Sequence, residues 1–145
     1  MNKYAKERPN QVYTRMPRMY LNFNIHEMSD AELKELYLKE NEGMELFSEE
    51  PDEYYKEAHK YRYESVDLPI GKWGYSNLVD ALVTYKYPND KMTAIVNNYL
   101  LDPTDEEALQ EFTQMQEWRK FAKELAKSVT NKQEYYEKNI FVRWS

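Results

Sequence analysis

The chain has 145 residues, with 20 Lys and Arg against 26 Asp and Glu, so its formal net charge is −6. This length predicts one domain that buries roughly 68–70% of its unfolded surface, and disorder throughout is therefore not expected. The absence of cysteine excludes disulfides and thiolate chemistry. No apolar run approaches the roughly 20 residues of a membrane span and the first residues lack a secretory signal, so we expect a cytoplasmic protein with no membrane partner.

The first residues of the chain are basic, whereas the segment that follows is acidic. Residues 1–25 carry a net charge of +4 and residues 26–64 a net charge of −8. Pro9 and Pro17 each bias the preceding residue toward extended backbone. We therefore predict an extended basic arm over residues 1–19, followed by a single helical domain over residues 20–145 with an apolar C-terminal tail. Two interpretations of the arm stay open: it folds back onto the acidic surface of its own chain, or it reaches a separate acidic surface.

Two helices are predicted in the acidic part of the chain. Ser29 and Glu32 have the spacing of a capping box, which predicts a helix over about 30–42. Pro51, followed by two acids, suits the first turn of a second helix over about 51–63, where a missing N–H costs nothing and acids meet the positive end of the dipole.

Three more helices are predicted in the second half. The first opens at Ser76 and ends before Pro88, the next begins at Asn89 or Asp90, and a second capping box at Thr104 opens the longest, over about 104–130 and extending at most to Lys138. Apolar residues at helical spacing give the predicted core of a five-helix body: Leu36, Leu82, Ile95, Val96, Phe112, Trp118 and Leu125.

The predicted fold class is mainly α, with about five helices in one compact body. Apolar and polar residues alternate over residues 20–25, which is typical of a half-buried strand. Residues 140–144 are short, β-branched and aromatic, so these two segments favour a small two-stranded β element.

The motifs of several chemistries are missing from the sequence. His26 and His59 are the only imidazoles, and both fit packing or surface positions better than catalysis. Gly71-Lys72 lacks the flanking residues of a phosphate-binding loop, and no metal-binding motif is present. We expect no catalytic residue, no cofactor, no metal site and no small-molecule substrate, although cation binding by the acidic residues 45–57 stays open.

The residue types that are enriched at protein interfaces are common in this chain, which has 14 Tyr, 3 Trp and 7 Met. We therefore expect a non-enzymatic structural or interaction protein, a component of a multi-subunit assembly whose partners are copies of itself or other subunits. The Lys-, Glu-, Asn- and Tyr-rich, Gly-poor composition makes a phage virion protein, capsid- or tail-associated, our preferred example. The arm and the tail are the predicted docking elements, through Tyr4, Arg8, Tyr13, Arg15, Arg18, Phe141 and Trp144.

Two alternatives carry less weight. Basic residues and tyrosines interleave in the arm, as in a small nucleic-acid-associated regulator, but the isoelectric point near 5.1 disfavours a phosphate backbone. An enzyme without a visible motif is the second alternative. If the arm serves only for docking, deletion of residues 1–18 leaves the melting temperature nearly unchanged.

Overall fold

The computed structural model describes the backbone of residues 1–144 and the side chains of residues 1–130. Its contacts divide the chain into two compact units, Met1–Asp67 and Leu68–Ser145, which we call the N-terminal unit and the helical unit. The predicted division between residues 19 and 20 lies inside a strand of the N-terminal unit.

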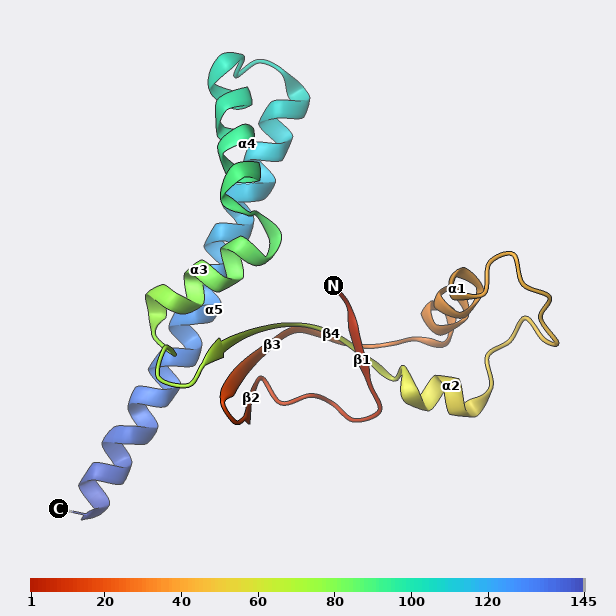
Figure 1. Cartoon of the computed structure of the whole chain (residues 1–145), viewed down its shortest axis with the longest axis horizontal. Coiled ribbons are helices and arrows are strands. Elements are labelled where there is room, and N and C mark those ends of the chain that lie inside the picture. Colours follow the sequence, from red (N-terminus) through yellow and green to blue (C-terminus); the bar gives the residue numbers. More distant parts are fainter. Residues whose placement is uncertain (145) are drawn as a thin grey trace. The chain divides into compact units, whose positions relative to one another are not determined.

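A sheet dominates the N-terminal unit (Figure 1). Its four antiparallel strands lie in the order β1-β4-β3-β2, so the first strand in the sequence, β1, pairs with the last strand in the sequence, β4. The two short helices between β3 and β4 contact each other, since the rings of Tyr37 and Tyr55 meet edge to face at 5.1 Å and Lys34 pairs with Glu50 at 2.7 Å. In chain order the elements are β1 (Lys3–Ala5), β2 (Val12–Arg15), β3 (Arg18–Glu27), α1 (Asp30–Glu40), α2 (Glu53–Ala58) and β4 (Tyr61–Pro69).

The two faces of this sheet differ in character because side chains alternate along each strand. One face carries Leu21, Phe23 and Val66, which are all buried. The other carries polar and aromatic residues. The predicted capping box of α1 is confirmed: the Ser29 hydroxyl accepts a hydrogen bond from the Glu32 amide and the Glu32 carboxylate accepts one from the Ser29 amide.

Three helices form the helical unit: α3 (Tyr75–Lys86), α4 (Asn89–Leu101) and α5 (Glu106–Trp144). Both α3 and α4 pack along α5 (Figure 1). The α5 positions Ala108, Met115, Ala122 and Val129 are buried, and their recurrence every seven residues gives the helix one continuous packing seam. The core between α4 and α5 is built from Tyr87, Ile95 and Met115, with Met92, Val96, Phe112 and Trp118 packed against them.

Two predicted helix caps were wrong, although the helices begin within two residues of the predicted positions. α3 follows Gly74 and has no side-chain cap, so Ser76 is not its cap. The predicted box at Thr104 does not form either, because the Thr104 hydroxyl donates to the Asp102 carboxylate at 2.6 Å. The Asp105 carboxylate instead accepts from the Glu107 amide at 3.2 Å in the first turn of α5.

The predicted fold class was wrong. The described chain is an α/β fold with five helices and a four-stranded antiparallel sheet, not a mainly α body with a two-stranded element. Residues 140–144 belong to the helix α5, and β3 already has β2 and β4 on its two sides, so β3 has no open edge for a further strand. The second helix ends at Ala58, and the tyrosines that follow belong to β4.

Candidate functional site

The side of the sheet opposite Leu21 and Phe23 is lined with cations, tyrosines and small polar residues. The strand register fixes this arrangement, since Lys3 lies opposite Tyr63 and Tyr13 lies opposite Tyr20. Alternation along the strands places the other members on the same side. We call this surface the polar face; its members are Lys3, Tyr13, Arg15, Arg18, Tyr20, Asn22, Tyr63 and Ser65.

The polar face is hollowed at its centre. The hollow has a volume of about 250 Å³ and receives side chains from all four strands. Its lining contains two cations, Lys3 and Arg15, and no carboxylate. It is therefore a space of a few atoms' width with a positive rim, which suits an anionic or hydrogen-bonding group rather than an apolar one.

Two cations of the polar face, Arg15 and Arg18, lie close enough to repel each other. Arg15 and Arg18 are directly opposite each other across β2 and β3, and like charges in that position destabilise a strand pair. Arg18 is partly neutralised, because its Nε donates to the Asp67 carboxylate and a terminal nitrogen donates to the Asp67 carbonyl at 3.3 Å. No hydrogen bond or ion pair of Arg15 is recorded among the described residues, so its charge is available to an anion.

The tyrosines offer flat surfaces beside these charges. The ring of Tyr13 is 51% exposed and lies 6.1 Å from the ring of Tyr20, tilted by 43°. The Lys3 ammonium lies 5.9 Å from the centre of the Tyr20 ring, within the range of a cation–π contact. This pairing keeps the Lys3 charge over the face.

Two polar residues form the floor. Asn22 is buried, and its amide nitrogen donates to the Asn10 carbonyl at 2.8 Å. The Ser65 hydroxyl is closed off from solvent and has no hydrogen-bond partner. A buried hydroxyl without a partner is uncommon, because it forfeits the hydrogen bonds it would make to water.

The structure brings together only part of the predicted docking set. Tyr13, Arg15 and Arg18 share the polar face, whereas Tyr4 lies on the opposite side of β1 with its ring 5.1 Å from His59. Arg8 is exposed in the segment between β1 and β2. The helix α5 contains the two C-terminal members of the predicted set, Phe141 and Trp144, whose side chains lie outside the described residues.

Asn22, Tyr63 and Ser65 were not among the predicted site residues. The alternation of tyrosines and polar residues in residues 61–67 is a strand signal that would have suggested Tyr63 and Ser65. Their position beside Lys3 follows only from the register of β1 on β4.

His59 and His26 each contact residues at one end of a short helix. The His59 ring stacks on Tyr55 at 4.1 Å, and its Nδ1 lies 2.8 Å from the Tyr55 carbonyl. Burial raises the pKa of Tyr55 above its ordinary value, and the hydrogen bond that its hydroxyl donates to Glu40 adds to that effect. His26 approaches both carboxylate oxygens of Glu32 at 2.9 Å, at the start of α1.

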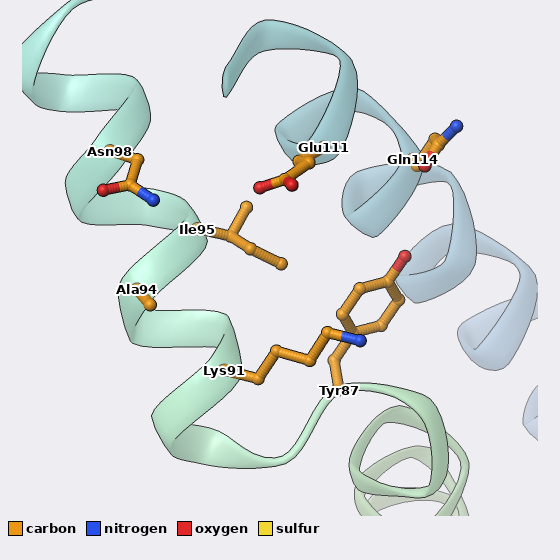
Figure 2. Close-up of a pocket in the computed structure, with 7 residues that line it drawn as sticks. All are labelled: Tyr87, Lys91, Ala94, Ile95, Asn98, Glu111 and Gln114. Atoms are coloured by element: carbon orange, nitrogen blue, oxygen red, sulfur yellow. The ribbon is translucent and has the colours of Figure 1, made fainter. Parts of the chain in front are cut away.

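The helical unit has a groove between α4 and α5 (Figure 2). It has a volume of about 340 Å³ and has Ile95 in its floor. Lys91 lies on one side, with its ammonium 5.2 Å from the Tyr87 ring, and Glu111 lies on the other. Burial, with a smaller effect of Glu111, raises the pKa of Tyr87. Because its two charges are opposite, this groove selects for neither sign of ligand, in contrast to the polar face.

Among the side chains described, no group of three or more His, Asp or Glu is close enough together to hold a metal ion. Within the same part of the chain, no helix has the length and apolar character needed to cross a bilayer. Comparison with protein-family models, with curated proteins and with solved structures finds no match to this chain.

Proposed function

We propose that this chain is a non-enzymatic protein that binds single-stranded nucleic acid on its polar face. The observation that carries the proposal is the gathering of Lys3, Arg15 and Arg18 with three tyrosines on one side of the sheet. Cations pair with phosphates, while tyrosine rings stack on bases of any sequence. The two kinds of side chain lie within one face, as binding to a strand requires.

The tyrosines favour a single strand over a duplex. Bases inside a duplex are stacked on each other and present only their edges, so an exposed ring such as Tyr13 can stack only on an unpaired base. The hollow beside it has Lys3 and Arg15 in its lining and no carboxylate, so it accommodates a negatively charged or polar group of the same strand.

The acidity of the chain does not oppose binding at this face. Asp67 is the acid that the register places there, and it already pairs with Arg18. The acidic residues of α1, α2 and the segment between them lie outside the four strands that carry the polar face. The excess of acids then limits nonspecific adhesion and leaves a local positive patch.

The proposal is tested by fluorescence anisotropy with labelled oligonucleotides. We expect a single strand to bind more tightly than a hairpin duplex of the same sequence. If Lys3 and Arg15 each neutralise one phosphate while Arg18 stays paired with Asp67, log K falls with log salt with a slope of about −1.4, and Arg15→Ala halves that slope.

The tyrosines provide a second, matched measurement. Loss of one stacked ring costs about 1–3 kcal/mol, so Tyr13→Ala weakens binding roughly 5- to 150-fold, whereas Tyr13→Phe retains most of it. Tyr54→Ala is the control, since Tyr54 is 82% exposed on α2, away from the polar face. Equal losses in both alanine variants contradict the proposal. Equal binding of polyglutamate identifies an acidic protein as the partner instead.

The second candidate function is a component of a multi-subunit assembly. Exposed leucines at the end of α4 favour it: Leu100 is 68% exposed and Leu101 is 87% exposed. The setting of such an assembly, a phage particle or another complex, stays a prediction.

A further inference from the structure

Apolar side chains are unusually exposed where α4 turns into α5. In addition to Leu100 and Leu101 in the last turn of α4, Leu109 in the first turns of α5 is 44% exposed. A cavity of about 340 Å³ lies at this turn, and we call it the leucine hollow; it is lined by Asn98, Leu101, Asp102, Asp105, Glu107, Ala108 and Glu111.

The rim of the leucine hollow is negative. Four of its seven lining residues are carboxylates. Two hydrogen bonds from Thr104 lower the pKa of Asp102, so this carboxylate stays charged over the whole neutral range. A partner for this surface must therefore combine an apolar side chain with positive charge.

The same chain carries a segment of that chemistry. The turn that joins β2 to β3 consists of Met16 and Pro17, flanked by the opposed pair Arg15 and Arg18. Met16 is 77% exposed. We call residues Arg15 to Arg18 the hairpin tip. It presents one flexible apolar side chain between two cations, which complements a hollow that combines the apolar Leu101 and Ala108 with four carboxylates.

We propose that the hairpin tip of one copy docks into the leucine hollow of a second copy. Met16 fills the apolar part of the hollow, and Arg15 pairs with its carboxylates. The joined surfaces are different from each other, so the contact is head-to-tail, and a pair joined by one contact keeps a free hollow on one copy and a free tip on the other. Contacts of this kind either close into a ring or continue as an open chain. Arg15 belongs to both the polar face and the hairpin tip, so the two proposals share this residue, whereas the leucine hollow lies in the helical unit and takes no part in nucleic-acid binding.

The test is the molar mass of the untagged protein by light scattering on a sizing column. At low salt we expect masses above the 17.6 kDa of one chain, increasing with concentration. Near 1 M salt, where the screening length falls to about 3 Å, the mass falls toward that of one chain. A monomer at low salt and high concentration overturns the proposal.

Variants identify the surfaces involved. Leu101→Ser removes an exposed apolar side chain from the hollow and is expected to give a monomer. Phe47→Ser is the matched control, since Phe47 is fully exposed in the segment between α1 and α2. Assembly that survives Leu101→Ser, or that is lost equally in Phe47→Ser, contradicts docking in the leucine hollow.

A charge exchange makes the test specific for the pair. Arg15→Glu and Glu111→Arg are each expected to be monomeric alone, because each places like charges at the contact. Mixed together, the two variants offer complementary tips and hollows and should assemble again. Failure of the mixture overturns the pairing. Glu111→Arg keeps the polar face intact, so unchanged oligonucleotide binding by this variant separates the two proposals.

Discussion

The two units of this chain hold themselves together in different ways. In the helical unit, neighbours in sequence are neighbours in space: α3, α4 and α5 follow one another and pack along one seam. In the N-terminal unit, the sheet is complete only when Lys3 pairs with Tyr63. Its short helices also depend on side-chain caps at Ser29 and Asp52, whereas α3 and α4 have none. Local packing stabilises one unit, and distant pairing and capping stabilise the other.

The largest expected difference in stability between the two units follows from deletion of residues 1–18. It removes β1 and β2, two of the four strands, and both edges of the sheet. We therefore expect the N-terminal unit to unfold, contrary to the expectation that the arm serves only for docking. Native-state hydrogen exchange checks this: amides of β3 and β4 should lose protection while those of α4 and α5 keep it. Retained protection of β3 shows that the first two strands are dispensable.

Truncation of one buried residue in each unit is expected to lower stability less than the deletion does, and by a similar amount in both units. Leu21 and Met115 are both fully buried, in the N-terminal and the helical unit respectively. Truncation of either to alanine costs about 2–5 kcal/mol. Met115→Ala should increase exchange mainly in α4 and α5, and Leu21→Ala mainly in β2, β3 and β4. The comparison fails if each variant loosens both units equally.

The smallest effect concerns the cap of α1. Hydrogen bonds from His26 and Ser29 lower the pKa of Glu32 from 4.5 to about 2. Because the folded value lies below the unfolded one, this stabilising contribution is complete above about pH 4.5 and is lost as the pH falls toward 2. The carboxyl resonance of Glu32, followed by NMR, should titrate near pH 2.

In the His26→Ala variant, the midpoint of that titration should rise toward 4.5. An unchanged midpoint for Glu32 in the variant contradicts the assigned role of His26.

Local signals in the sequence predicted the helices well. The capping box at Ser29 and the breaks at Pro88 and Pro103 placed four helix boundaries within a few residues, because caps and prolines act on their nearest neighbours. The sheet was missed for the opposite reason. β1 and β2 have only three and four residues, Pro17 stands in the turn between β2 and β3, and the partner of β1 lies about sixty residues away. Nothing local distinguishes such a strand from an extended arm.

Some residues of the candidate site could be predicted from the local sequence, and others could not. Tyr13, Arg15 and Arg18 are close in sequence, and their composition alone drew attention to them. Tyr63 and Ser65 join them only through the register of the sheet. Residues 140–144 show the limit of propensity, since β-branched and aromatic residues there lie in the helix α5.

The pairing of Lys3 with Tyr63 also determines when the protein can fold during its synthesis. The hairpin of β2 and β3 can form as soon as residue 27 has left the ribosome. β1 must wait until β4 has emerged, some forty residues later, which takes about 2–8 s at typical translation rates of about 5–20 residues per second. Throughout that interval the nascent chain exposes a positively charged, tyrosine-bearing hairpin on an unfinished sheet, close to the RNA of the ribosome that is making it.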